Sequence, residues 1–544
     1  MKKRLISTLL VGIMTMSLVG CGSQQTTTNE LETQSKVEES ASADVAETVV
    51  EEKVEITPIE IEKSMAGNPL LGFGEEGELV YAGDAKSVTY GGDPSALVVD
   101  DTLYLYVGHD TAPASAYVIP EYLCYSTKDM VNWTYEGVAL SMKDVTWGDN
   151  NSAWAGQVAR HYDEELGKDM YYLYFCSWNN KDAGKQSIGV AVSENPAGPF
   201  VDLGQALVLG SFTTDETSAW NDIDPTVWIE TDENGEEHRY LAWGNGKLYM
   251  CELNEDMISV KDIDGDGEIV FDKDIVSQMV PTSFTEAPWI YRRQDENGNY
   301  YGDYYLFYAY GWREQMAFAT TDDLMNGRWY FGEIIMEPSA TSNTNHPAVV
   351  DFLGKTYFIY HNGSLPKGSG FRRVACVEEV VFESDGWVNY IQETATGVSG
   401  KTSSLTAGNG EVLAHEWFNN SGVDASYPYL NMKLGSNLDK TTEADMLWEI
   451  VPGKMDEANA NYVSIESYNK PGLYITATAD GVGLSQDDDG KKANAQTFIT
   501  VSGLSGEGVS FESLEYVGMY LTLSDSVATL TDGSDAEACS FVIE

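Results

Sequence analysis

Short runs of aliphatic and aromatic residues recur along most of this chain, and Gly, Asp and Asn separate them. Val, Ile, Tyr, Phe and Trp fit the pleated, half-buried surface of a strand, and the separating residues favour turns. The three-to-four-residue spacing of an amphipathic helix is scarce. The pattern therefore predicts an all-β protein.

One kind of apolar run occurs repeatedly, at residues 103–107, 171–175, 240–243, 304–308 and 357–360. Aligned on Leu105, Leu173, Leu241, Leu306 and Ile359, successive copies lie 68, 68, 65 and 53 residues apart. This period is longer than that of a solenoid repeat, but it suits a four-stranded propeller blade with its loops. We therefore expect a five-bladed β-propeller over residues 66–400.

A short motif precedes each run. The motifs are Asp93-Pro94, Trp154-Ala155, Asp224-Pro225, Glu286-Ala-Pro288 and His346-Pro347. Pro within a sheet is confined to strand starts and edges, so each motif is expected at the mouth of a strand. Equivalent positions of successive blades converge on the axis of a propeller. Three acids and a His are therefore predicted to meet at one site.

A second repeat follows a polar loop near residue 400. Tyr429-Leu430, Tyr474-Ile475 and Tyr520-Leu521 are spaced by 45 and 46 residues, and the units close on the aromatic residues Trp448, Phe498 and Phe541. Three such units favour a β-trefoil-like domain over residues 405–544. A structural cap or another β-module is the alternative.

The N-terminus carries targeting signals. Basic residues precede an apolar run too short to favour a membrane span, so residues 1–20 are interpreted as a signal peptide. Leu18-Val19-Gly20-Cys21 resembles the bacterial lipobox, whose Cys becomes lipidated. Residues 21–65 are acidic and polar with almost no aromatics, which predicts a disordered tether. We expect an extracellular lipoprotein, anchored to the bacterial cell membrane through Cys21.

Charge and cysteine usage exclude other classes of protein. The chain has 86 acidic and 32 basic residues, and its net charge of −54 would repel a nucleic-acid backbone. An odd number of cysteines follows Cys21, and they lie far apart. A disulfide framework is therefore not expected, and most of these cysteines are interpreted as buried free thiols.

The three acids suit glycoside hydrolysis, which commonly uses two carboxyl groups on either side of the scissile bond. Asp93 is the candidate general base, which must be ionised to deprotonate water. Glu286 lies among apolar residues that would raise the pKa of its carboxyl, so it is the candidate general acid. Asp224 would tune the pKa of that acid by like-charge repulsion and orient the sugar. Asp222 is a weaker candidate for that role.

Two aromatic residues near these motifs are candidate substrate contacts. Trp154 and Trp289 could each stack on a sugar face, because an aromatic ring supplies a flat apolar surface. Either ring could equally serve the core alone.

These motifs resemble those of glycoside hydrolase family 43. Gly-Gly-Asp93-Pro, Asp-Ile-Asp224-Pro-Thr-Val and Thr-Glu286-Ala-Pro-Trp match its three catalytic motifs in order and spacing, and the likeness runs from about Asn68 to Gly400. It is similar above all to the branch of inverting arabinoxylan arabinofuranohydrolases, which remove arabinofuranosyl side chains. The C-terminal repeats resemble the arabinose-binding domain of the arabinofuranosidase B type.

The resemblance implies further roles. An arginine that reaches a sugar hydroxyl falls at Arg373, with Arg372 one residue away, and His346 would contact the substrate or hold a water-bound calcium ion. No cofactor is otherwise required. A second metal motif, Asp262-Ile-Asp-Gly-Asp-Gly267, begins like an EF-hand loop, but Lys273 occupies the position of the bidentate Glu. An acidic turn is the better interpretation.

Other functions remain open at this point. The same family includes β-xylosidases, which act on xylo-oligosaccharides, and arabinan hydrolases, which act on arabinan. The fructan-hydrolysing propellers carry Arg-Asp-Pro and Glu-Cys motifs, where this chain has Ile223-Asp224-Pro225 and Glu286-Ala287. A surface lipoprotein that only binds polysaccharide is the alternative from another class.

Overall fold

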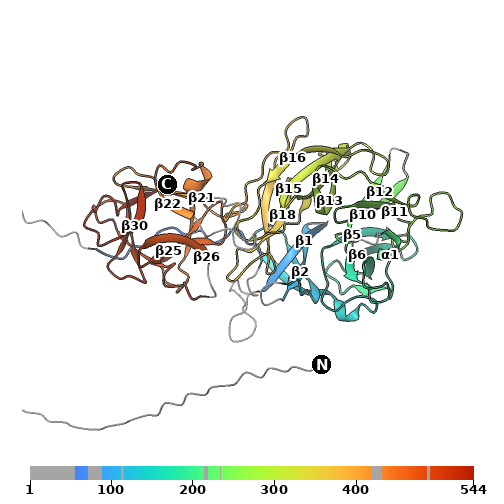
Figure 1. Cartoon of the computed structure of the whole chain (residues 1–544), viewed down its shortest axis with the longest axis horizontal. Coiled ribbons are helices and arrows are strands. Elements are labelled where there is room, and N and C mark those ends of the chain that lie inside the picture. The colour runs from blue at the N-terminus through green and yellow to red at the C-terminus, as the bar shows by residue number, and fades with distance from the viewer. Residues whose placement is uncertain are drawn as a thin grey trace, which may run out of the picture. The chain divides into compact units, whose positions relative to one another are not determined.

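A computed structural model describes residues 56–71, 89–111, 116–213, 219–232, 234–417, 432–486 and 490–544. The expected signal peptide, Cys21, most of the expected tether and the Tyr429-Leu430 copy lie outside these residues. The described chain is all-β with almost no helix, and its α1 (Gly210–Thr213) is a single turn (Figure 1). No helix within these ranges is long and apolar enough to span a membrane.

The first part of the chain forms five antiparallel sheets in sequence order. The first contains β1 (Tyr90–Val99), β2 (Thr102–Asp110), β3 (Glu121–Thr127) and β4 (Trp133–Ser141); the second contains β5 (Gly156–Asp163), β6 (Lys168–Trp178), β7 (Gln186–Ser193) and β8 (Val201–Asp202). The third contains β9 (Thr226–Thr231), β10 (Glu237–Trp243), β11 (Leu248–Glu252) and β12 (Ile275–Gln278). The fourth contains β13 (Phe284–Gln294), β14 (Tyr300–Tyr310), β15 (Gln315–Thr321) and β16 (Tyr330–Met336), and the fifth β17 (Ala348–Phe352), β18 (Lys355–Asn362) and β19 (Val374–Val380).

These sheets are the blades of a five-bladed propeller, as the repeat predicts. The first strands of the blades, β1, β5, β9, β13 and β17, each contact the next, and β17 contacts β1, which closes the ring. The five recurrent apolar runs lie on the second strands. The residues used to align them are completely buried: Leu105, Leu173, Leu241, Leu306 and Ile359. Packing of the blades against one another therefore explains the repeat.

The C-terminal domain is a closed, barrel-like β domain. Six of its strands pair in a ring: β20 (Ser403–Ala407), β23 (Leu447–Pro452), β24 (Tyr462–Ser467), β27 (Phe498–Ser502), β28 (Val509–Ser513) and β31 (Phe541–Ile543). Three hairpins complete it: β21 (Ala414–Trp417) with β22 (Met432–Gly435), β25 (Leu473–Thr478) with β26 (Gly481–Gln486), and β29 (Tyr520–Ser524) with β30 (Val527–Thr531). Trp448, Phe498 and Phe541 are fully buried in its core. The structure thus shows a closed β-barrel with three hairpins, and the β-trefoil assignment stays a prediction.

The segment before the first blade corrects one expectation. Residues 56–65 were expected to belong to the disordered tether, but they pack against the C-terminal barrel. The Ile59 N–H donates to Thr500 O at 2.9 Å, and the Ser64 N–H donates to Ile450 O at 2.7 Å. Pro58 forms a β-bridge with Val501. Backbone hydrogen bonds to the barrel, which the composition of the segment does not reveal, give these residues a defined place.

The propeller and the barrel also touch at the loop between β18 and β19. The side-chain amide of Gln486, at the end of β26, donates to the backbone oxygens of Gly363, Leu365 and Gly368 at 2.5, 3.1 and 3.2 Å. A side chain on Gly472 would collide with Ser364. The barrel therefore contacts the loop that leads into Arg373.

The cysteines of the described residues are buried free thiols, as expected: Cys124, Cys176, Cys251, Cys376 and Cys539.

Candidate active site

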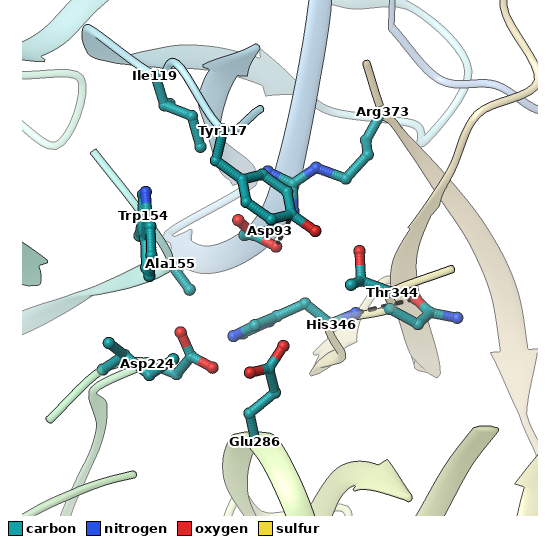
Figure 2. A pocket seen from close by; sticks show the side chains of 12 residues that line it. Asp93, Tyr117, Ile119, Trp154, Ala155, Asp224, Glu286, Thr344, His346 and Arg373 are labelled. Atoms are coloured by element: carbon teal, nitrogen blue, oxygen red, sulfur yellow. Dashed lines mark hydrogen bonds and ion pairs between the residues drawn. The ribbon is translucent and has the colours of Figure 1, made fainter. Parts of the chain in front are cut away.

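A pocket opens where the first strands of the blades meet. Residues from all five blades line it: Asp93, Tyr117, Ile119, Trp154, Ala155, Ile223, Asp224, Glu286, Thr344, Asn345, His346 and Arg373. Figure 2 shows Asp93 and Arg373 on one side of the pocket, Asp224 and Glu286 on another, and His346 reaching between them. All of the predicted site residues in the described chain meet here except Trp289.

Irregular backbone directs the acids into the pocket. Asp93 has φ 50° and lies in a bulge of β1, where the pairing with β2 shifts between Gly92 and Ser95. Asp224 has φ 57°, and Ala287, directly after Glu286, has φ 58°. These left-handed conformations are costly for non-glycine residues and concentrate at functional sites. A bulge re-aims a side chain, so the local strain accompanies the placement of the acids.

Asp93 is held in its ionised form. Arg373 Nη1 donates to Asp93 Oδ1 at 2.5 Å, and the Asp93 N–H donates to His361 Nδ1 at 3.1 Å. Burial by itself would raise the pKa of Asp93, but the Arg373 guanidinium and nearby His residues outweigh it and lower that pKa below its ordinary value. Asp93 is therefore available as a base at neutral pH.

Asp110 fixes Arg373. Its carboxylate accepts hydrogen bonds from Nε, Nη2 and the backbone N–H of Arg373, at 2.9, 3.0 and 2.9 Å. A fork of parallel charge-assisted bonds sets both position and orientation. Asp110 and His361 lie within the stretch that resembles the family, from about Asn68 to Gly400, but nothing in the sequence assigned them a role. The structure also selects Arg373 over Arg372 as the arginine that lines the pocket.

Glu286 has the opposite electrostatic environment. Burial raises the pKa of Glu286 above its ordinary value, even though hydrogen bonds from neighbouring side chains favour its ionised form. One of these is donated by Asn245 Nδ2 to Glu286 Oε2 at 2.5 Å. The buried Glu314 also favours the ionised form and so lowers the pKa of Glu286. Asn245 and Glu314 were not found from the sequence, because neither lies in a repeated motif.

Asp224 lies close enough to Glu286 for the charge of one carboxyl to affect the other. Its Oδ2 accepts a hydrogen bond from the Ala287 N–H at 2.9 Å. Burial and the nearby Glu286 charge raise the pKa of Asp224 well above its ordinary value. The pKa of Asp224 is thus raised, whereas that of Asp93 is lowered. Environments that push the pKa values of carboxyl groups apart are what acid and base catalysis at one pH requires.

The two predicted stacking residues have different positions. Trp154 is half-buried in the pocket wall, with Tyr117 edge-on at a ring-centroid distance of 6.0 Å. Trp289 is 4% exposed, packs in the propeller core and donates its indole N–H to Val349 O at 3.0 Å. The expectation that Trp289 binds sugar is wrong, because its side chain points into the space between blades. Tyr117, which no sequence pattern marked, lies in the pocket instead.

His346 is neutral at ordinary pH. Burial lowers its pKa to about 4. Its Nδ1 is buried and has no hydrogen-bond partner among the described groups, so the ring has capacity for a ligand.

A cluster of acidic side chains, Asp262, Asp264 and Asp266, lies outside this pocket. Lys273 Nζ forms ion pairs with Asp264 and Asp266 at 2.5 and 2.9 Å, and the acidic turn stays a prediction.

Comparison with known proteins identifies the propeller. Residues 88–388 match the model of glycosyl hydrolases family 43. The chain belongs to glycoside hydrolase family 43. It is therefore a glycoside hydrolase, and the alternative of a protein that only binds polysaccharide loses its basis. Residues 423–541 match the α-L-arabinofuranosidase B (ABFB) domain, so this family 43 enzyme carries a second carbohydrate-related domain.

Curated relatives of this family 43 enzyme have several activities. A β-D-galactofuranosidase of Aspergillus niger is 26% identical over 52% of this chain and 77% of its own length. A xylosidase/arabinosidase of Bacteroides ovatus is 28% identical over 56% of this chain and 95% of its own. An arabinoxylan arabinofuranohydrolase of Paenibacillus polymyxa is 26% identical over 57% of this chain and 51% of its own length.

Proposed function

We propose that this enzyme is an inverting α-L-arabinofuranosidase that removes arabinofuranosyl side chains from arabinoxylan or arabinan. The observation that carries the proposal is the combination, in one chain, of the family 43 pocket with a domain of the arabinofuranosidase B type. Relatives named for arabinoxylan and for arabinosidase activity support the same sugar. A relative named as a β-D-galactofuranosidase also supports a pocket for five-membered sugar rings.

The proposed mechanism follows from the electrostatics of the pocket. Asp93 takes a proton from water, and the resulting hydroxide bonds to the anomeric carbon. Glu286 gives its proton to the glycosidic oxygen as the bond between that oxygen and the anomeric carbon breaks. Asp93 ends protonated and Glu286 ionised, and exchange with solvent restores both. A negative charge on Asp224 disfavours ionisation of Glu286 and thereby keeps the acid protonated before reaction.

The deciding experiment is sugar release by the soluble chain from Val54 onward. Wheat arabinoxylan, debranched arabinan and xylo-oligosaccharides are supplied separately, and NMR identifies the first anomer released. Arabinose from a branched polymer, initially in the β-configuration, is the expected result. Xylose from xylo-oligosaccharides would establish the β-xylosidase alternative, and arabinose from debranched arabinan alone the arabinan hydrolase. A first product with retained configuration would contradict the proposed mechanism.

We further propose that the C-terminal domain holds the enzyme on its polymer. The support is its match to the ABFB domain and its barrel built from three similar units. Incubation of the Glu286→Gln variant with insoluble arabinoxylan separates binding from turnover. The variant is expected in the pellet, and free arabinose is expected to release it. A variant that stays in solution would show that the domain is only structural.

A calcium ion at His346 belongs to the same proposal. The neutral ring and the unpartnered Nδ1 support it, and water would supply the remaining ligands. When bound, the ion would contribute positive charge near the reacting sugar. Calorimetric titration of calcium into chelator-treated enzyme, and into its His346→Ala variant, tests the assignment. Equal binding by both proteins would contradict it.

The lipid anchor is also proposed, and the lipobox-like sequence that ends at Cys21 supports it. The full chain, expressed in a bacterium supplied with labelled palmitate, is expected to carry the label in the membrane fraction. The Cys21→Ala variant is expected to lose the label. A labelled variant or an unlabelled parent chain would contradict an extracellular enzyme anchored in this way.

A further inference from the structure

Two exposed tryptophans lie in loops beside the candidate acid. Among the tryptophans whose exposure the structure describes, only Trp220, Trp312 and Trp387 are exposed, at 52%, 66% and 42%. A large apolar ring in contact with water loses the benefit of burial, so such rings often mark a binding surface. The mechanism described above uses neither Trp220 nor Trp312, although both belong to loops at the pocket end of the propeller.

An aromatic path connects Trp220 to the pocket wall. Its ring meets that of Trp178 edge-on at a centroid distance of 6.3 Å, and Trp178 meets Trp154 of the pocket in the same way at 5.8 Å. The backbone holds this arrangement, because the N–H of Gln186, opposite Trp178 in the second blade, donates to Ala219 O at 2.8 Å. The apolar surface of the pocket thus continues outward to an exposed ring.

Trp220 is also connected to the candidate acid, through the next residue along the chain. Asn221 Nδ2 donates to Asn245 O at 2.7 Å, and Asn245 Nδ2 donates to Glu286 Oε2 at 2.5 Å. In the proposed mechanism Glu286 gives its proton to the leaving oxygen, so the departing part of the substrate must extend from the pocket past this carboxyl. Trp220 is placed to meet that part of the substrate.

The second ring, Trp312, lies beyond the acid in the order of the blades. It belongs to the turn between β14 and β15, and Thr285, directly before the acid, donates from Oγ1 to Gly311 O in this turn at 2.9 Å. The next residue, Arg313, donates to two backbone oxygens of residues 339–342, in the segment that leads to the fifth blade, at 2.6 and 3.1 Å. The two exposed rings therefore flank the acid, one toward the second blade and the other toward the fifth.

We propose that Trp220 and Trp312 bind the main chain of the branched polysaccharide, one on each side of the branch point. This inference rests on the proposed function. In side-chain removal the arabinofuranosyl unit occupies the pocket, and the main chain is the leaving group, which extends in two directions from the branched unit. A unit cut from a chain end leaves a main chain in one direction only. Two rings that flank the acid therefore fit the removal of side chains better than cleavage from chain ends.

The chemistry of the two rings selects a neutral main chain. An indole ring offers a flat apolar face on which a sugar unit can stack. The net charge of the chain is −54, which would repel an acidic polysaccharide. Stacking on a neutral sugar needs no charged partner, so this contact is compatible with the acidity of the protein.

Trp220→Ala and Trp312→Ala test the proposal on substrates with different main chains. The substrates are branched oligosaccharides from whichever polymer the parent enzyme cleaves, with arabinose on an internal or on a terminal unit. Each Ala variant should lose about two- to tenfold in kcat/KM on the internally branched substrate, the size of a stacking contribution. Only one of them should lose on the terminally branched substrate, whose main chain extends one way. The loss on a nitrophenyl arabinofuranoside, which has no main chain, should be smaller in both.

Conservative replacements and a distant ring provide the controls. Trp220→Phe and Trp312→Phe keep an aromatic face and should recover most of the loss. Trp387→Ala removes an exposed ring that lies away from the pocket, since a side chain on the neighbouring Gly386 would touch Arg293, near the opposite end of β13 from the acid. This variant should match the parent enzyme on every substrate.

Three outcomes would overturn the inference. Equal losses on the nitrophenyl glycoside and on the branched substrates would show that the rings only support the pocket. Parental kcat/KM in both Ala variants on the internally branched substrate would show that the rings contact no main chain. Equal losses by both variants on the terminally branched substrate would contradict an arrangement on two sides of the branch point.

A binding measurement separates this inference from the proposed function. In the Glu286→Gln enzyme, tryptophan fluorescence follows the binding of an internally branched arabinoxylan oligosaccharide without turnover. Addition of either Ala replacement should raise the Kd about two- to tenfold. If the parent enzyme releases no arabinose, the proposed function fails, and the Kd ratios still decide the role of the rings. An unchanged Kd in both combinations would overturn the inference.

Discussion

Single carboxyl groups in this enzyme differ because their nearest neighbours differ. Asp93 lies against the guanidinium of Arg373, which Asp110 also binds. The pKa of Asp93 is lowered as a result. Glu286 lies among amide and carboxyl groups, and burial raises its pKa. Both carboxyls are enclosed in the same pocket, so burial by itself does not separate them. The charge of Arg373 makes the difference.

Removing either reacting carboxyl should abolish most of the turnover. Asp93→Asn cannot accept a proton from water, and Glu286→Gln cannot give one to the leaving oxygen. Each is expected to lower kcat by about 10²–10⁴-fold, the usual contribution of general acid or base catalysis. Turnover of arabinoxylan and binding of the same polymer are measured in parallel. Full activity in either variant would remove that residue from the mechanism.

The hydrogen bonds between Asp110 and Arg373 should affect the acidic limb of the pH profile, through the pKa of Asp93. Arg373 favours the ionised form of Asp93, so Arg373→Gln raises the pKa of that base. Because Asp93 must be ionised to act, the acidic limb of kcat/KM is expected to move to higher pH. Asp110→Asn, which weakens those hydrogen bonds, should move it in the same direction by less. A limb that stays in place in both variants would show that the arginine does not control the base.

Single strands place these groups through irregularities rather than through regular pairing. The bulge at Asp93 interrupts β1, and Gly92 beside it lies against the Arg373 guanidinium so closely that a side chain at this position would collide with it. Regular pairing would instead fix side chains to alternate faces of the strand. The bulge thus brings the backbone of β1 and the arginine before β19 into contact.

A methyl group at Gly92 should therefore damage both stability and activity. Gly92→Ala is expected to cost about 1–3 kcal/mol, as overpacking in a dense interior does. It should also lower kcat/KM, because the guanidinium must move away from Asp93. Gly483→Ala is the matched control, since a side chain there would meet nothing within 4 Å. Thermal unfolding and initial rates of both variants provide the check, and equal behaviour would refute the close contact.

At the scale of the whole molecule, the barrel is part of the environment of the pocket. Gln486 holds three backbone oxygens of the loop that leads into Arg373. Phe371, in the same loop, packs against Tyr117 at a centroid distance of 4.8 Å. The C-terminal domain therefore contacts a segment that itself contributes to the pocket, in addition to its proposed role on the polymer.

Loss of the Gln486 hydrogen bonds should lower activity at the active site as well as stability. Gln486→Ala leaves the loop oxygens without their donor, and a cost of about 1–3 kcal/mol is expected for such groups when buried. The melting temperature and the rate on a small nitrophenyl glycoside should both fall. Asp480→Ala, at the exposed tip of the same hairpin, should change neither. A Gln486 variant with the parental rate on the small substrate would limit the barrel to polymer binding.

The sequence by itself determined the fold and the three acids, because both follow from repeated local patterns. Buried second strands impose the same apolar run on every blade, and the strand mouths carry Asp93, Asp224 and Glu286 in equivalent motifs. Only the tertiary structure decided which groups meet these acids. Asp93 and Arg373 are 280 positions apart, and neither Glu314 nor Asn245 belongs to a repeat. Closure of the propeller ring brings Asp93 to Arg373, and packing between blades buries Trp289. Backbone hydrogen bonds place residues 56–65 on the barrel. These contacts join residues far apart in the chain, and a local sequence pattern records only neighbours.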